Sequence, residues 1–444
     1  MESPEVKVAS YQGASIDPNS KGLGNVPGTS VPLADAARLE WNLLDEDVSL
    51  PAAVLYAERV EHNLQWMQAF VTRYGVKLAP HGKTTMAPQL FRRQLDAGAW
   101  GITLATAHQT RAAYRGGVMR VLMANQLVGR RNMTMIAELL SDPAFEFFCL
   151  VDSVQGAEQL GEFFREARRP LQVLLELGVP HGRTGVRDAP TRRAVVEAIG
   201  RYPDSLRLAG VEMYEGILKD EDQVRAFLRE AVSVTEELTA AGAFARGPAL
   251  LSGAGSAWYD VVAEEFAGAA KAGRIEVVLR PGCYVTHDVG AYKAAQARIL
   301  THNPVAREMG GALVPALHLW AYVQSLPEPG LAIVGFGKRD AAYDAGYPEP
   351  ARHYRPSRER GDADADTATQ PPASPREVSA DEGWKVFQMM DQHAYMQIPP
   401  NADLAVGDMI AFDISHPCLT FDKWRQVLMV DPSWRVTDVI ETFF

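Results

Sequence analysis

The chain has 444 residues, 47% of them hydrophobic and 22% charged, which is enough apolar material to fill roughly two or three globular domains. Its 55 acidic residues outnumber the 44 basic ones, the net charge is -11 and basic runs are missing, so the composition argues against a nucleic-acid partner. Three widely separated cysteines, no signal peptide and no stretch of about twenty apolar residues predict a cytoplasmic protein without a membrane span.

The first fifty residues lack the rhythm of the next part of the chain, and we expect residues 1–50 to form an N-terminal arm that packs on a later β domain or on a partner subunit. Residues 51–290 repeat a short apolar run, a turn and an amphipathic helical stretch. The eight runs are 76–79, 101–105, 118–124, 145–151, 171–177, 206–213, 249–252 and 275–280. Because continuous apolar runs are typical of parallel strands buried on both faces, we predict an α/β fold with a (β/α)8 TIM barrel; an open doubly wound sheet is the alternative.

After about residue 290, extended patterns separated by turns replace this rhythm, beginning with residues 291–300. They predict a mainly β C-terminal domain over residues 291–444. Residues 343–383 are rich in Asp, Pro, Ser, Arg and Ala, a composition that cannot bury enough apolar surface to become ordered. We therefore expect a flexible surface insertion at 343–383.

The first predicted strand runs into Pro80-His81-Gly82-Lys83-Thr84-Thr85, which places a lysine where a strand gives way to a helix. In a barrel of this kind, the chemistry lies on the loops that follow the strands. A partly desolvated amine at the mouth of an apolar strand is a nucleophile for an aldehyde cofactor, so Lys83 is the candidate reactive residue, with His81 as a second catalytic candidate. An ordinary lysine on a surface loop is the alternative.

The turn at 252–256 follows the seventh predicted strand and leads into a helix. Backbone N–H groups in such a turn, at Gly253, Gly255 and Ser256, are suited to hold a phosphate, although any turn between a strand and a helix can use glycine. Tyr284, after the eighth strand, either lines the phosphate end or packs in the core.

Two other loops at the same end of the barrel carry candidate binding residues. Arg183 lies between glycines, where it either donates to a phenolate or carboxylate oxygen or forms a surface salt bridge. Tyr214 follows the sixth strand and either meets a ring nitrogen or caps the barrel mouth.

A possible metal motif lies far along the chain, at His416-Pro417-Cys418. Two residues separated by one position after a strand can face one ion, and a nitrogen and a thiolate together suit zinc. Two protein ligands would leave positions for water or substrate, as a catalytic zinc requires. A buried, inert cysteine is the alternative for Cys418.

Together these segments resemble the D-serine dehydratase and D-threonine aldolase family, pyridoxal-phosphate enzymes that share the barrel fold of alanine racemase. The likeness covers most of the chain from about residue 51, apart from 343–383. It rests on Pro80-His81-Gly82-Lys83-Thr84, Gly182-Arg183-Thr184-Gly185-Val186, Arg280-Pro281-Gly282-x-Tyr284 and His416-Pro417-Cys418.

The resemblance implies a role for each matching residue. Lys83 is similar to the lysine that carries pyridoxal phosphate, Arg183 to the residue that faces the ring hydroxyl, and Tyr214 to the residue near the pyridine nitrogen. Gly253, Gly255 and Ser256 match the phosphate loop, and His416 and Cys418 match the metal pair.

In this family, aldolases usually carry a carboxylate at the second metal position and dehydratases a cysteine, so Cys418 favours the dehydratase branch. The resemblance thus implies a D-serine dehydratase that depends on pyridoxal phosphate and on zinc or another divalent metal. It would eliminate the β-hydroxyl of a D-amino acid to give a keto acid and ammonia. A D-threonine aldolase, which would release glycine and an aldehyde, is the first alternative, and a non-catalytic pyridoxal-phosphate carrier is another. Related folds also imply a homodimer.

Overall fold

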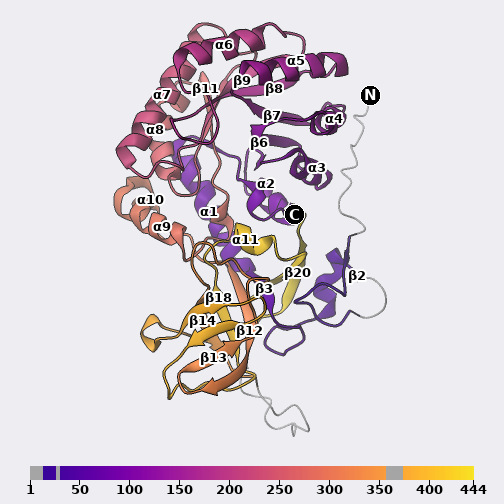
Figure 1. Ribbon diagram of the computed structural model, residues 1–444, viewed down its shortest axis with the longest axis vertical. Coiled ribbons are helices and arrows are strands. Elements are labelled where there is room, and N and C mark those ends of the chain that lie inside the picture. The colour runs from indigo at the N-terminus through magenta and orange to yellow at the C-terminus, as the bar shows by residue number, and fades with distance from the viewer. Residues whose placement is uncertain (1–13, 27–30, 357–373) are drawn as a thin grey trace.

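The computed structural model describes residues 14–26, 31–356 and 374–444. Eight parallel strands form the first sheet, in the order β4-β11-β10-β9-β8-β7-β6-β5 (Figure 1). They are β4 (Lys77–Leu78), β5 (Ile102–Leu104), β6 (Arg120–Gln126), β7 (Glu146–Val151), β8 (Leu171–Leu177), β9 (Leu206–Met213), β10 (Ala249–Gly253) and β11 (Ile275–Leu279). The two ends of this series meet through a parallel bridge between His81 and Thr103, where the Thr103 N–H donates to the Pro80 carbonyl at 2.9 Å. The predicted barrel is therefore confirmed.

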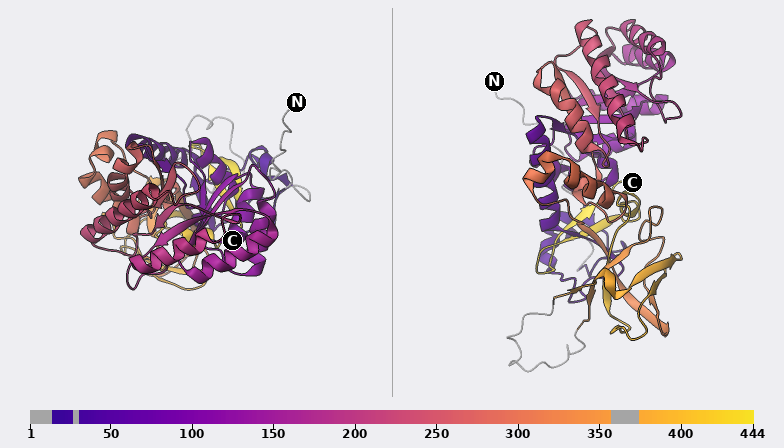
Figure 2. Two further views of the ribbon diagram at one scale, coloured as in Figure 1. Left: turned by 90° about the horizontal axis from the view of Figure 1, so that it is seen from above. Right: turned by 90° about the vertical axis from the view of Figure 1, so that its left-hand side faces the viewer.

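Helices lie around the outside of the barrel (Figures 1 and 2). They are α1 (Ala57–Tyr74), α2 (Pro88–Asp96), α3 (Ala107–Arg115), α4 (Arg130–Leu139), α5 (Val154–Ala167), α6 (Ala189–Gly200), α7 (Glu221–Ala240) and α8 (Tyr259–Lys271). Side-chain caps fix the starts of four of them, because the oxygens of Thr106, Ser153, Asp188 and Asp220 each accept a bond from the N–H three residues later. Inside the barrel, alternate strand residues such as Leu122, Phe148 and Leu250 form a separate buried cluster.

The second domain is a largely antiparallel sheet that lies below the barrel in Figure 1. Its strands are β3 (Ala52–Tyr56), β12 (Leu317–Glu328), β13 (Leu331–Val334), β14 (Glu349–Tyr354), β15 (Arg376–Glu377), β16 (Lys385–Met389), β17 (Ala394–Gln397), β18 (Met409–Asp413), β19 (Gln426–Val430) and β20 (Val436–Glu441). This confirms a mainly β domain after the barrel. Strand β3, however, pairs with β12 and β19, so the chain starts in the β domain and crosses to the barrel through helix α1. The prediction began the barrel domain at residue 51, whereas the chain leaves the β-domain sheet only after Tyr56.

Residues 291–300, expected to be extended, are helical. Helix α9 (Ala291–His302) is followed by α10 (Pro304–Met309), and the side chain of Asn303 caps the second helix by accepting from the Ala306 N–H. The prediction was wrong because the segment is rich in alanine and in straight side chains, which favour a helix. These two helices carry the chain from the barrel to the β domain.

The segment 343–383 is not uniformly a flexible insertion. Strand β14 pairs with β18 in the sheet and also with β15, so this part of the prediction is wrong. Residues 357–373, at the centre of the segment, lie outside the described residues.

The N-terminal segment packs against the β domain. Its described part contains β1 (Ser15–Ile16), β2 (Val31–Pro32) and the 3-10 helix η1 (Leu33–Leu39). Trp41 and Leu43 are buried in one cluster with Trp320 of β12 and Leu428 of β19. Within the described parts of the chain, no helix has the length and apolar character needed to cross a bilayer.

Candidate active site

The loop after β4 presents Lys83 at the end of the barrel. Residues Gly82–Thr84 form a single 3-10 turn, η2. A Cβ atom on Gly82 would lie 2.7 Å from the Phe91 ring, so only glycine lets this turn pack down on the barrel. Because Gly82 and Thr84 take the buried positions of the turn, Lys83 is exposed, and the partial desolvation expected for its amine is not seen.

His81, the second catalytic candidate, lies beside this lysine. Its Nδ1 atom is enclosed and has no hydrogen-bond partner. Burial, followed by the positive charges of Lys83, Arg280 and Arg183, holds the pKa of His81 well below its usual value. The imidazole is therefore neutral and lies among three cations.

Arg183 and Tyr214 come together from the loops after β8 and β9. The Arg183 guanidinium lies over the Tyr214 ring, 5.0 Å from its centroid, in a cation–π contact. Arg183 is exposed, whereas Tyr214 is half-buried and burial raises the pKa of its hydroxyl. Because the charge of Arg183 also acts on His81, these two residues and Lys83 share one end of the barrel.

Deeper in the barrel lies a group of buried carboxyls. Glu212 forms an ion pair with Arg280, and both side chains are almost fully buried. Burial raises the pKa of Glu212 to about 8 in spite of Arg280, and burial also raises the pKa of Glu176. Glu212 Oε2 and Arg280 Nε are buried without a hydrogen-bond partner, so each has unused bonding capacity.

The turn after β10 holds the carboxyl group of Glu215, whose pKa is raised above its usual value by burial. The Gly255 N–H donates to Glu215 Oε1 at 2.6 Å and the Ala254 N–H donates to Glu215 Oε2 at 3.1 Å. Ala254 has a φ of +80°, which is strained for a residue with a side chain and turns successive N–H groups toward one point. Ser256 Oγ accepts from the N–H groups of Gly282 and Cys283, both at 3.2 Å. Of the predicted donors Gly253, Gly255 and Ser256, the Gly255 N–H donates to Glu215, while Ser256 accepts through its hydroxyl oxygen.

His416 and Cys418 approach the barrel from the β domain. His416 Nδ1 lies 2.8 Å from Asp344 Oδ2, and Cys418, the first residue of helix α11 (Cys418–Phe421), has its Sγ 3.4 Å from Thr84 Oγ1. A second sulfur, Cys283 Sγ, lies 3.7 Å from Cys418 Sγ. These contacts join the predicted metal pair to the turn that carries the lysine.

The same contacts set the charges of the pair. A hydrogen bond with the Cys283 thiol, and then one with the His416 imidazole, lowers the pKa of Cys418 to about 4. The bond with Cys418, and then the one with Asp344, raises the pKa of His416 to about 9. A nitrogen and a thiolate that contact each other form a donor set suited to zinc. No group of three or more His, Cys, Asp or Glu side chains with a metal-binding arrangement occurs in the described ranges.

Tyr284 is placed differently from the other candidates. Its side chain is buried and its hydroxyl accepts a bond from Gln94 Nε2 of helix α2 at 3.3 Å. Sequence reasoning missed Tyr292, whose pKa is raised by the charge of Cys283 and by burial, and which therefore lies against the cysteine pair. It also missed Asp344 and Glu215, because only folding brings them to His416 and to the phosphate turn.

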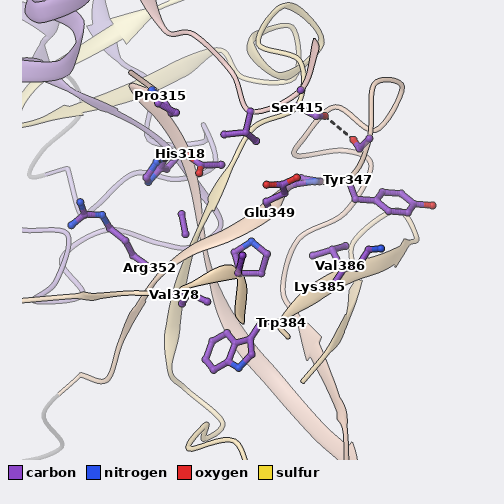
Figure 3. A pocket seen from close by; sticks show the side chains of 18 of the residues that line it. Pro315, His318, Tyr347, Glu349, Arg352, Val378, Trp384, Lys385, Val386 and Ser415 are labelled. Atoms are coloured by element: carbon purple, nitrogen blue, oxygen red, sulfur yellow. Dashed lines mark hydrogen bonds and ion pairs between the residues drawn. The ribbon is translucent and has the colours of Figure 1, made fainter. Parts of the chain in front are cut away.

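A cavity lies elsewhere, at the edge of the β domain. It has a volume of about 910 Å³ and is lined by residues that include Pro315, His318, Arg352, Trp384 and Ser415 (Figure 3). Ser415 precedes His416, but none of the predicted site residues lines this cavity. It is therefore separate from the barrel end that carries Lys83.

Comparison with known proteins agrees with this architecture. The family model described as "Alanine racemase, N-terminal domain" matches residues 56–270, and the one described as "Putative serine dehydratase domain" matches residues 316–430. Among solved structures, D-threonine aldolase from Filomicrobium marinum superposes with a TM-score of 0.72 at 22% identity, covering 91% of this chain and 97% of that chain. An alanine racemase-like protein from Idiomarina loihiensis superposes with a TM-score of 0.65 at 15% identity, covering 89% and 96%.

Two curated relatives match in sequence. The D-threonine aldolase of Arthrobacter sp. is 26% identical over 308 residues, which are 68% of this chain and 75% of that protein. The D-threo-3-hydroxyaspartate dehydratase of Delftia sp. is 30% identical over 201 residues, which are 43% of this chain and 52% of that protein. One relative is thus named as an aldolase and the other as a dehydratase.

Proposed function

Because the chain belongs to the D-serine dehydratase and D-threonine aldolase-like family of lyases with the alanine racemase fold, we propose that it is a pyridoxal-phosphate-dependent lyase for β-hydroxy D-amino acids. Within that class we propose the dehydratase reaction, with D-serine as a substrate and a keto acid and ammonia as products. The resemblance supports this choice through the cysteine at position 418. Retro-aldol cleavage to glycine and an aldehyde is the second candidate, favoured by the named aldolase relative.

One observation supports the proposal most strongly: the lysine turn and the metal motif meet. Thr84, the neighbour of Lys83, contacts the Cys418 sulfur at 3.4 Å across 334 positions of sequence. A lysine amine and a pair of zinc-type ligands at one barrel end suit elimination of a β-hydroxyl, because one group must act at Cα and another at the leaving oxygen.

The residues at the barrel end fit pyridoxal phosphate. The N–H groups of Ala254 and Gly255 already bind a carboxylate, so they face inward and accept an anion. Lys83 would bond the aldehyde, and Arg183 and Tyr214 would border the ring. When bound, pyridoxal phosphate supplies an electron sink for the carbon that carries the amino group.

The protein's own residues would then handle protons and orientation. Lys83 Nζ is the group we assign to take the proton from the substrate Cα. His81, neutral because it is buried among cations, would accept a hydrogen bond at Nδ1 without adding charge beside the lysine. Arg183 is free of a carboxylate ion pair in the described structure's salt bridges and would pair with a substrate or cofactor oxygen.

His416 and Cys418 are the residues we propose as zinc ligands. Asp344 holds His416 Nδ1, which fixes the ring and leaves Nε2 for the metal. When bound, zinc supplies a Lewis acid for a hydroxyl group. The protein provides two ligands, so this arrangement would leave positions for water and substrate.

The test is product analysis with pyridoxal phosphate, zinc and either D-serine or D-threonine. We expect keto acid and ammonia, and we expect Lys83→Ala to lose activity about a hundredfold or more together with the cofactor's visible absorbance. Lys77→Ala, an exposed lysine of β4, is the matched control and should keep both. Glycine and aldehyde would replace the dehydratase by the aldolase, and full activity of Cys418→Ala with no zinc loss would remove the metal from the proposal.

We also propose a homodimer in the cytoplasm, by analogy with related folds. Small-angle scattering of the purified protein checks the assembly, and a monomer would contradict it.

A further inference from the structure

The anion site at the end of β10 is closed by a side chain of this protein. Glu215 follows strand β9 and has no exposed surface, yet its carboxylate reaches across to the N–H groups of Ala254 and Gly255. Both carboxylate oxygens are engaged, at 3.1 Å and 2.6 Å. Two N–H groups that share one carboxylate cannot at the same time bind a phosphate.

Several neighbouring donors are occupied as well, although Arg280 Nε has no hydrogen-bond partner. The N–H groups of Gly282 and Cys283 both donate to Ser256 Oγ. The nearby guanidinium of Arg280 is held by Glu212 and by the Met213 carbonyl at 3.0 Å. An incoming phosphate therefore meets the Glu215 carboxyl group at the N–H groups of Ala254 and Gly255.

The loop that carries Glu215 allows it to leave. Gly216 is exposed and Ile217 is 41% exposed, so the buried part of the loop ends at Glu215. Beyond it, the Leu218 N–H donates to the Glu215 carbonyl at 2.8 Å, which closes a local turn, and the half-buried Leu218 side chain packs against the main core. Withdrawing the carboxyl group would require this turn to move, and its tip, Gly216 and Ile217, is exposed.

We propose that Glu215 is an internal competitor for the cofactor's phosphate: its carboxylate closes the phosphate cradle and must withdraw before a phosphorylated cofactor binds. This inference rests on the function proposed above. Glu215 then weakens the binding of pyridoxal phosphate selectively, because an unphosphorylated aldehyde has no group that enters the cradle. The chain would hold its cofactor less tightly than its other contacts allow, and would release it on dilution.

The test compares wild-type protein with Glu215→Gln and Glu215→Ala after the cofactor is removed. Each is titrated with pyridoxal phosphate and with pyridoxal, followed by visible absorbance and tryptophan fluorescence. We expect Glu215→Ala to lower the Kd for pyridoxal phosphate about tenfold or more, with Glu215→Gln intermediate, since the loss removes charge-assisted hydrogen bonds. The Kd for pyridoxal should not change. Asp222→Ala, an exposed carboxylate at the start of α7, is the matched control and should leave both constants unchanged.

Weaker or unchanged binding of pyridoxal phosphate by both variants would overturn the inference and make Glu215 a brace that shapes the turn. If Glu215→Ala does not fold, Glu215→Gln decides alone. Calorimetry with inorganic phosphate separates this inference from the proposed function. If no form binds pyridoxal phosphate, the proposed function fails, whereas phosphate binding by Glu215→Ala but not by wild type would still support the internal competitor.

Discussion

Replacing Glu212 by glutamine should change how the stability of this protein depends on pH. Glu212 is 1% exposed, only one of its carboxylate oxygens has a partner, and that partner is Arg280. Burial raises its pKa from 4.5 to about 8, so the folded protein keeps a proton on this carboxyl where the unfolded chain has lost it. Glutamine resembles the protonated form and carries no charge at any pH.

The size of the effect follows from proton linkage. Between pH 4.5 and about 8 the unfolded state binds fewer protons at this site, so the free energy of unfolding falls as pH rises. Each pH unit in that window is worth about 1.4 kcal/mol, and from pH 5 to 7.5 the wild type should lose about 3 kcal/mol relative to Glu212→Gln. The stabilising contribution of Glu212 is complete below its pKa in the unfolded chain, 4.5. It is lost as the pH rises past its pKa in the folded protein, about 8.

The assay is urea unfolding of cofactor-free protein at several pH values between 5 and 8, for wild type, Glu212→Gln and Glu58→Gln. Glu58 is an exposed carboxylate of helix α1, so its substitution controls for the change in charge. A difference between wild type and Glu212→Gln that stays constant across this range would refute the reasoning. It would mean that the ion pair with Arg280 keeps Glu212 charged throughout.

Three further changes test other parts of the structure. Asp408→Ala should lower the free energy of unfolding in urea by about 3 kcal/mol, because Asp408 is 2% exposed and accepts two hydrogen bonds from Arg355. A decrease of less than about 1 kcal/mol would show that water replaces these hydrogen bonds. Asp344→Asn should weaken zinc binding about tenfold in a chelator competition, since Asp344 holds the His416 ring, and an unchanged affinity would contradict that role. Ala254→Gly should raise the free energy of unfolding by about 1 kcal/mol by relieving the φ of +80°, whereas a lower melting temperature would show that this backbone is unstrained.

The barrel could be predicted because its signal is local. Each strand is buried on both faces and each helix packs one face, so both leave a periodic pattern in the sequence, and β8 and β9 begin and end at the predicted residues. Strand β3 could not be assigned to its sheet in this way. An isolated apolar run has the same pattern in either domain, and its pairing with β12 is set by residues some 260 positions away.

The helix α9 shows a second limit. Its expected extended form came from a change of rhythm after the barrel, yet its alanines favour a helix. Short segments between domains have little periodicity, so local propensity was the better guide there.

For the site, the sequence by itself determined which chemistry was available: a lysine after a strand, a small-residue turn before a helix, and a His-x-Cys pair. Only the tertiary structure decided which of these groups meet, as when it brought Thr84 to Cys418 and Asp344 to His416. It also placed Glu215 in the anion site. The physical reason is that residue type and local periodicity are properties of neighbouring positions in the sequence. Contacts and burial set the charges of these groups, and they arise only when distant loops come together at one end of the barrel.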